Sequence, residues 1–309
     1  MSAKKPNELY INRIYDAPVK MVWEAWVDPK KAAKWWGPRG FTITTHSKDL
    51  KVGGVWHYTM HGPDGVDYPN KTKYLEVEEY SRLVYDHGGY DDRPPLFRVT
   101  VNFTELGEKT KMEMTMTLAT PEAAKEISKF IKQAGGNATW DRLAEYLSDD
   151  EKFVINRTFE ATIDKVFEMW TNPEHLPKWL PPTGFDMKFI SVDIKAGGTS
   201  FYSMSNGEVT MYGKSIYQEI SRPHRLVYKQ VFCDEQGNIS RHPMAPTWPE
   251  TMLVVVTFVE EETNLTRVTA TSEIIGEATA EERATFHESK GGMTQGWSGS
   301  FDRLDEVLK

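Results

Sequence analysis

The 309-residue chain contains a single cysteine, no run of eighteen apolar residues, and no apolar segment in its first ten residues, MSAKKPNELY. One thiol cannot form a disulfide within the chain, so Cys233 suits a reducing compartment. The lack of apolar segments argues against a secretion signal and against membrane insertion. We therefore expect a cytoplasmic protein that is stabilised by its core alone.

Basic clusters and metal-binding patterns are missing as well. The net charge is −8, which argues against nucleic acid or an anionic lipid surface as a partner. His57 and His61 lie four residues apart, but no cysteine and no third ligand accompanies them. Ser298, within GWSGS, lacks the spacing of a nucleophile elbow. We predict no metal, no cofactor and no catalytic serine.

The chain does contain a long internal repeat. Residues 11–41 and 155–185 align without a gap, and 13 of these 31 positions are identical. The correspondence continues through two RLVY strings to an Asp-Arg-Leu triplet near each end of the chain. A period near 150 residues is too long for a solenoid unit, and the total length also fits two domains. We predict domains at residues 1–149 and 150–309.

Each copy has the same order of expected elements. After an alternating strand, Asp16 is expected to cap a first helix, and Asp28-Pro29 to end that helix and start a second, short one. The strands that follow in the first copy are expected from residues 41, 54, 68, 82, 96 and 109. Helical patterns close the copies at residues 123–147 and 280–308. This order predicts an α+β fold in which a curved antiparallel sheet packs its concave face on one long helix.

Several strings resemble a known superfamily over nearly the whole chain. They are DAP-x4-W-x2-W from Asp16, WWGP from Trp35, MHGPDGVDYPN from Met60, RLVY from Arg82 and Arg225, RHPMAPTWPETM from Arg241, MTQGW from Met293, and the two DRL triplets. The chain resembles the SRPBCC superfamily, which has the START and birch-pollen-allergen helix-grip fold. Within it, the chain is most similar to the branch named after the activator of heat-shock-protein-ninety ATPase.

The resemblance implies two tandem helix-grip domains, each with a long C-terminal helix and with two short helices after its first strand. In relatives, the cavity between sheet and helix takes lipids, polyketides or other apolar molecules. Duplication followed by divergence suggests that one copy binds while the other supports it. The absence of a retained compound in freshly purified protein, together with cavities below about 300 Å³, would instead favour packed cores.

Aromatic residues make up 12% of the chain and include ten tryptophans, which must either fill cores or line a cavity. Trp56, Tyr58 and Met60 alternate onto one face of their strand, as Tyr202 and Met204 do in the second copy. Plain core packing is the alternative for this set. The predicted ligand-binding residues are Trp56, Tyr58, Met60, Tyr85, Trp140, Tyr202, Met204, Tyr228, Met293 and Trp297.

Glu76 and Glu219 occupy the same place in both copies, where a buried carboxylate would be a natural general base. The alternative is an exposed strand face or a salt bridge to a neighbouring strand. Arg13 and Arg157 are expected to form ion pairs at the surface. A loop that begins at Cys233 is about a dozen residues longer than its counterpart and is expected to cover a pocket mouth or the join between domains.

These features predict binding of a small apolar or aromatic ligand, lipid- or polyketide-like, as the function. One alternative is a cyclase, dehydratase or hydrolase in which Glu76, Glu219, Tyr58 or Tyr202 moves protons. Another is a chaperone-associated interaction module, which the acidic composition and the short segment before the first strand speak against. Two copies of the chain, or its two halves, are expected to pair.

Overall fold

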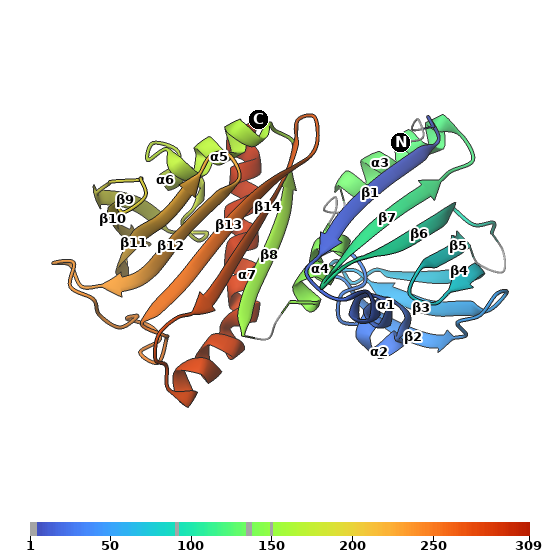
Figure 1. The fold of residues 1–309 in the computed structure, drawn as a ribbon, viewed down its shortest axis with the longest axis horizontal. Coiled ribbons are helices and arrows are strands. Elements are labelled where there is room, and N and C mark those ends of the chain that lie inside the picture. Colours follow the sequence, from blue (N-terminus) through green and yellow to red (C-terminus); the bar gives the residue numbers. More distant parts are fainter. Residues whose placement is uncertain (1–4, 90–92, 134–137, 149–150) are drawn as a thin grey trace. The chain divides into compact units, whose positions relative to one another are not determined.

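The computed structural model describes residues 5–89, 93–133, 138–148 and 151–309. The chain forms two compact units, Met1–Ser148 and Asp149–Lys309 (Figure 1). Each unit contains one seven-stranded antiparallel sheet.

The elements of the first unit follow the expected order. They are β1 (Glu8–Tyr15), α1 (Val19–Val27), α2 (Pro29–Ala32), β2 (Thr42–Lys48), β3 (Val55–His61), β4 (Asp67–Glu78), β5 (Arg82–Gly89), β6 (Phe97–Leu106), β7 (Lys109–Thr117), α3 (Pro121–Gln133) and α4 (Ala138–Tyr146). The second unit repeats this order with a single closing helix. Its elements are β8 (Lys152–Phe159), α5 (Ile163–Thr171), α6 (Leu176–Trp179), β9 (Asp186–Ser191), β10 (Thr199–Ser205), β11 (Thr210–Ser221), β12 (Arg225–Cys233), β13 (Thr251–Glu262), β14 (Leu265–Ile274) and α7 (Ala280–Leu308).

The strands form a meander that the first strand closes. In the first unit the order is β1-β7-β6-β5-β4-β3-β2, and in the second it is β8-β14-β13-β12-β11-β10-β9. Ile11 of β1 lies opposite Met114 of β7, and Ile155 of β8 lies opposite Ala270 of β14. The last strand of each meander thus pairs with the first strand of its unit. The predicted α+β helix-grip fold is confirmed.

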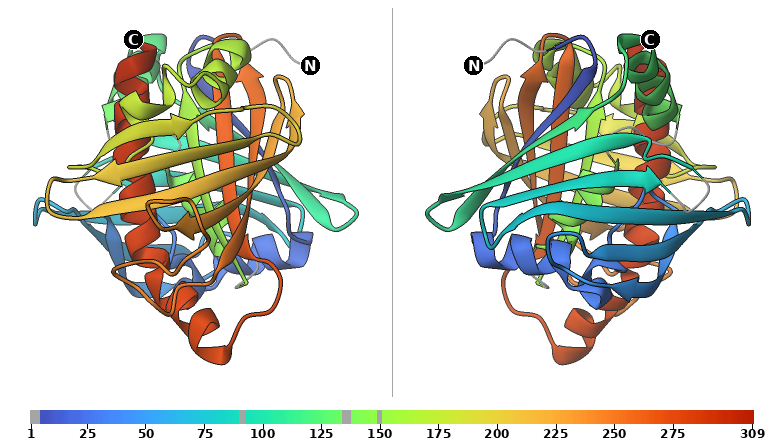
Figure 2. Two further views of the ribbon diagram at one scale, coloured as in Figure 1. Left: turned by 90° about the vertical axis from the view of Figure 1, so that its left-hand side faces the viewer. Right: turned by 90° about the vertical axis from the view of Figure 1, so that its right-hand side faces the viewer.

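The closing helix differs between the units. In the second unit α7 has 29 residues, and it begins with a capping box in which Thr279 and Glu282 each bind the other's backbone N–H. It packs Phe286, Phe301 and Leu304 into the core against one face of the sheet (Figures 1 and 2). In the first unit the predicted helix at 123–147 comprises α3 and α4, and residues 134–137 between them lie outside the described part.

Two local predictions were wrong in instructive ways. Asp16 does not cap α1, because the helix begins only after Pro18, and the exposed Asp16 carboxylate instead pairs with Lys109.

Arg13 does not lie at the surface. It is buried 3.8 Å from the carboxylate of Asp141, the first residue of the DRL triplet. In the second unit the matching Arg157 is partly exposed and pairs with Asp302 and Asp305.

The arginine of the DRL triplet ties the closing helix to the segment after α2. Arg142 Nη1 donates hydrogen bonds to the backbone oxygens of Gly37, Pro38 and Phe41 at 2.8, 2.9 and 3.1 Å, and Nη2 donates to Lys34 at 3.3 Å. All four carbonyls belong to the segment that follows α2. In the second unit Arg303 donates to Trp179 and Pro182 at 3.1 and 3.4 Å. The leucines that follow, Leu143 and Leu304, are fully buried.

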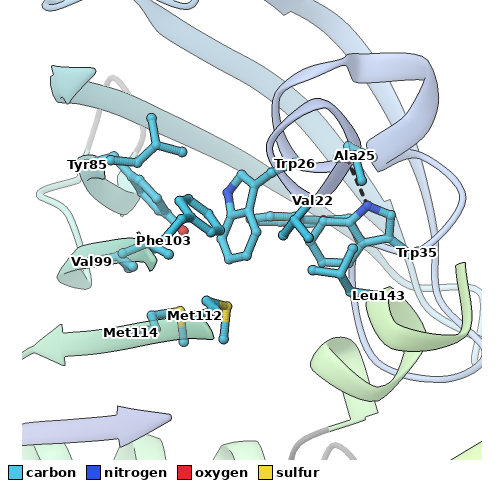
Figure 3. Close-up of a cluster of buried hydrophobic side chains, with 14 of the residues drawn as sticks. Val22, Ala25, Trp26, Trp35, Tyr85, Val99, Phe103, Met112, Met114 and Leu143 are labelled. Carbon is cyan, nitrogen blue, oxygen red and sulfur yellow. Dashed lines mark hydrogen bonds between the residues drawn. The ribbon is translucent and has the colours of Figure 1, made fainter. Parts of the chain in front are cut away.

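The core of the first unit is built around Trp26 of α1 (Figure 3). Its ring stacks on Trp140 of α4 at 5.3 Å and meets Phe103 edge-on at 5.5 Å. Trp35 packs beside it and donates from Nε1 to the backbone oxygen of Ala25 at 2.9 Å. These aromatic contacts hold α1, α4 and the segment after α2 on the same face of the sheet.

We expect Arg142→Ala to lower the free energy of unfolding of the first unit by roughly 2–3 kcal/mol, because a charged donor shared among four carbonyls is lost. Urea unfolding followed by tryptophan fluorescence measures the change. The control is Arg98→Ala, which removes an exposed pair with Asp86 and should cost less than about 1 kcal/mol. Equal losses in the two variants would contradict the assigned role of Arg142.

Candidate functional site

The first unit has a partly open cavity of about 160 Å³ between its sheet and its closing helices. Strands β1, β3, β5, β6 and β7 form one side, and α3, α4 and the segment after α2 form the other. The lining residues are Ile11, Trp36, Gly37, Pro38, Met60, Tyr85, His87, Phe97, Val99, Met114, Met116, Phe130, Ile131, Thr139 and Trp140. Figure 3 shows Tyr85, Val99 and Met114 among the core side chains of this unit.

Three of the five residues predicted for the first unit line this cavity, namely Met60, Tyr85 and Trp140. Trp56 and Tyr58 do not. Their rings stack on each other at 4.2 Å and are almost fully buried in the core. For these two residues the structure matches the core-packing alternative.

His87 is a lining residue that the sequence analysis missed. It follows Tyr85 by two positions on β5, so both side chains lie on the same face of the sheet. The imidazole stacks on Phe97 at 5.0 Å, and burial lowers its pKa from 6.5 to about 4. The ring is therefore neutral at physiological pH.

Hydrogen bonds connect His87 to the core. Trp36 Nε1 donates to the Tyr58 hydroxyl at 3.3 Å, and the Thr72 hydroxyl lies 3.4 Å from His87 Nδ1. Tyr58 and Thr72 are each 1% exposed, so these contacts are shielded from water. A buried row of polar groups thus ends at the cavity wall.

The tyrosines cannot serve as general bases. Burial raises the pKa of Tyr58 and of Tyr85 well above the ordinary value of 10, so both hydroxyls keep their protons. In the second unit, burial raises the pKa of Tyr202 to about 12. A hydroxyl in this state donates a hydrogen bond but does not remove a proton from a substrate.

Glu76 and Glu219, the weak candidates for a general base, are not among the lining residues of either cavity. Glu76 accepts a hydrogen bond from Arg82 Nε at 2.7 Å, and Glu219 accepts one from Arg225 Nε at 3.1 Å. All four side chains are substantially exposed. A bulge in β4, and another in β11, precedes the carboxylate. The salt bridge to a neighbouring strand, the stated alternative, is what the structure contains.

The corresponding cavity of the second unit measures only about 20 Å³. Tyr202 and Tyr228 line it, together with Tyr217, Phe189 and Trp170. The other predicted residues, Met204, Met293 and Trp297, do not line it. Trp297 stacks on Trp170 at 5.8 Å, and Met293 packs against the core. The side chains leave no room here for an organic molecule.

The polar groups also differ between the units. Gln230 occupies the position of His87, and Ser215 lies opposite it, as Thr72 lies opposite His87. Gln230 Nε2 donates to the Tyr202 hydroxyl at 3.3 Å. In the second unit this side chain is therefore hydrogen-bonded within the core.

The long loop after β12 folds onto α7. Arg241 binds the Glu282 carboxylate, the Thr247 and Thr285 hydroxyls are 2.8 Å apart, and Trp248 meets Phe286 edge-on at 6.0 Å. These contacts fasten the first two turns of α7 within the second unit.

Lys48 is a second residue that the sequence analysis missed. Its ammonium lies 3.8 Å from the centre of the Trp56 ring and donates to the backbone oxygen of Trp26 at 3.1 Å. Burial lowers its pKa from 10.5 to about 7. Because Trp26 lies in the last turn of α1, we interpret Lys48 as a cap for that helix rather than a nucleophile.

The described residues contain no group of three or more His, Cys, Asp or Glu side chains placed to hold a metal ion. None of the described helices combines the length and the apolar character needed to cross a membrane.

A further hollow of about 480 Å³ lies along α3, and charged side chains such as Glu122, Lys125 and Lys129 line it. It does not suit an apolar ligand.

A sequence profile of the family described as "Activator of Hsp90 ATPase homolog 1-like protein" matches residues 16–148 and again residues 160–309. No curated protein matches the chain. Among solved structures, protein NE0264 from Nitrosomonas europaea is 24% identical, with a TM-score of 0.43, covering 47% of this chain and 96% of its own. A protein from Arthrobacter aurescens is 25% identical, with a TM-score of 0.43, covering 47% and 89%. The di-domain ARO/CYC BexL of the BE-7585A biosynthetic pathway is 12% identical, with a TM-score of 0.38, covering 98% of both chains.

The lowered pKa of His87 predicts a pH-dependent stability of the first unit. Between pH 6.5 and 4 the His87 side chain is protonated in the unfolded chain but not in the folded unit. The free energy of unfolding is therefore highest above pH 6.5 and falls by up to about 3 kcal/mol towards pH 4. Urea midpoints measured across this range should fall less in His87→Gln than in the wild type. His46→Gln, at an exposed position, is the control. An unchanged pH profile in His87→Gln would refute the assignment.

Proposed function

Because the chain belongs to the Activator of Hsp90 ATPase homolog 1-like family in both halves, we propose that its first unit binds a small, apolar, single-ring molecule between sheet and helices, while the second unit is a closed scaffold. The observation that carries this proposal is the difference between a cavity of about 160 Å³ and one of about 20 Å³ in two copies of one fold.

The volume selects the size of the ligand. A cavity of roughly 150 Å³ in an engineered protein stays dry and accepts benzene, whereas pockets for drug-sized molecules measure about 300–1,000 Å³. The cavity of the first unit, about 160 Å³, is smaller than the roughly 300 Å³ below which packed cores were expected, so its size does not support the lipid- or polyketide-like ligand expected from the sequence. It is large enough for one aromatic ring, which is the ligand that we propose instead.

The chemistry of the lining supports an aromatic ligand. Trp36 and Trp140 supply ring faces, and Met60, Met114 and Met116 supply flexible, polarisable side chains that adapt to the shape of a ring. None of the described lining residues is charged at neutral pH. An ionised ligand would lose its hydration there without gaining an ion pair.

Binding without turnover is favoured over the enzymatic alternative. A cyclase, dehydratase or hydrolase needs a group that exchanges a proton near neutral pH. Among the described lining residues, the Tyr85 hydroxyl keeps its proton and the His87 imidazole stays neutral at this pH. The carboxylates of Glu76 and Glu219 form salt bridges away from the cavity. The chaperone-associated alternative draws its support from the name of the family alone. The cytoplasmic location and the pairing of copies or halves remain predictions.

We expect toluene to bind the wild-type protein with one site and to change its tryptophan fluorescence, since Trp36 and Trp140 lie at the cavity. Palmitate should not bind, because the cavity cannot hold its chain. Isothermal titration calorimetry checks both, and native mass spectrometry of freshly purified protein reveals any retained compound. Binding of palmitate but not of toluene would contradict the proposed ligand size.

A matched pair of substitutions tests whether the cavity is the site. Val99 lies opposite Tyr85 in the first unit, and Val254 lies opposite Tyr228 in the second. Val99→Phe should fill the cavity, abolish toluene binding, and change the free energy of unfolding by less than about 1.5 kcal/mol. Val254→Phe should retain binding but destabilise its unit by about 1–3 kcal/mol, because no space awaits the larger ring. Retained toluene binding in Val99→Phe would place the site elsewhere.

A further inference from the structure

The buried hydrogen bonds behind the cavity of the first unit have a direction. The indole Nε1 of Trp36 is a donor only, so the Tyr58 oxygen accepts from it. The Thr72 hydroxyl is also buried, with 1% of the residue exposed, and its hydrogen-bond partner among the described residues is His87 Nδ1, 3.4 Å away. A buried hydroxyl hydrogen without an acceptor is costly, so Thr72 donates to this nitrogen.

The same reasoning sets the protonation of His87. Because the Thr72 hydroxyl donates its hydrogen to His87 Nδ1, this nitrogen is the acceptor. A neutral imidazole carries one N–H, and a nitrogen that accepts cannot carry it. The hydrogen of the His87 ring is therefore on Nε2.

The Nε2–H group has no partner among the described residues, although His87 lines the cavity. The stacked Phe97 ring restrains the imidazole plane, so the direction of this donor is restrained as well. Tyr85, two residues earlier on the same face, also lines the cavity with its protonated hydroxyl. The polar side chains His87 and Tyr85 of the described lining can thus donate hydrogen bonds to a ligand.

The second unit, whose cavity is much smaller, has different residues at the positions of Trp36 and His87. Leu180 takes the place of Trp36, so the donor at the head of the row is absent. Gln230 donates a hydrogen bond to the Tyr202 hydroxyl and is not among the residues that line the small cavity. The imidazole N–H of His87 and the larger cavity therefore occur together in the first unit.

Building on the proposed binding of a single ring, we propose that His87 recognises a hydrogen-bond acceptor on that ring through Nε2–H, so that the preferred ligand is a neutral aromatic ketone, aldehyde, ester or amide. His87 would contact the ligand itself. Thr72 would act as a positioning residue that holds the tautomer.

Acetophenone and α-methylstyrene test this proposal, because they have the same shape and differ in an oxygen that accepts a hydrogen bond. By calorimetry, the wild type should bind acetophenone about 3- to 10-fold more tightly, the effect of one hydrogen bond. His87→Phe should bind both probes with the affinity that the wild type has for α-methylstyrene. Val99→Phe, which fills the cavity, should bind neither.

Nitrogen-15 NMR of the His87 ring gives a readout that does not depend on a ligand. The wild type should show a protonated Nε2 and an unprotonated Nδ1, and Thr72→Val should shift the ring towards a mixture of tautomers and reduce the preference for acetophenone. A protonated Nδ1 in the wild type would overturn the inference.

The two proposals fail differently. If neither probe binds the wild type, the proposed binding function itself is wrong. If both bind equally well to the wild type and to His87→Phe, ring binding stands and the role of His87 is refuted.

Discussion

The guanidinium of Arg142 gathers four backbone oxygens after α2, and through them it couples the closing helix to one wall of the cavity. Gly37 and Pro38, which it binds, are themselves lining residues, as is the neighbouring Trp36. Two residues before Arg142, Trp140 stacks on Trp26 and also lines the cavity. The shape of the cavity therefore depends on α4 staying in register with the segment after α2. A charged donor that serves several carbonyls enforces that register better than apolar contacts alone, because the contacts have direction.

The two units use the same frame to reach different interiors. Both have a stacked tryptophan pair, a buried leucine in the DRL triplet, and a tryptophan that donates from Nε1 to a backbone oxygen near the end of the first helix of its unit. In the second unit, the continuous α7 and the loop fastened to its first turns fill the interior with Phe286, Trp248 and Met293. Divergence after duplication has thus changed the filling and kept the frame.

The sequence was sufficient to predict the fold because its signals are local and occur twice. Alternating strands, proline and glycine turns, and the helical stripes appear in both copies in the same order. The predicted aromatic residues were less informative, since Trp56 and Tyr58 lie on the same face of β3 as Met60 yet pack into the core. Which of them reaches free volume depends on how closely the helices approach the sheet, and no local pattern encodes that distance. The row from Trp36 to His87 joins residues on four segments, so it exists only after folding. Its visible signs in the sequence are the change from RLVYDH to RLVYKQ and the change from Trp36 to Leu180.

The filled interior of the second unit sets the stoichiometry of the whole chain. Two homologous halves would ordinarily suggest two equivalents of ligand and coupling between them. If the first unit binds as proposed, a cavity of useful size in one unit only implies a single equivalent of ligand per chain and a hyperbolic saturation curve. The duplication would then add no cooperativity between the two halves.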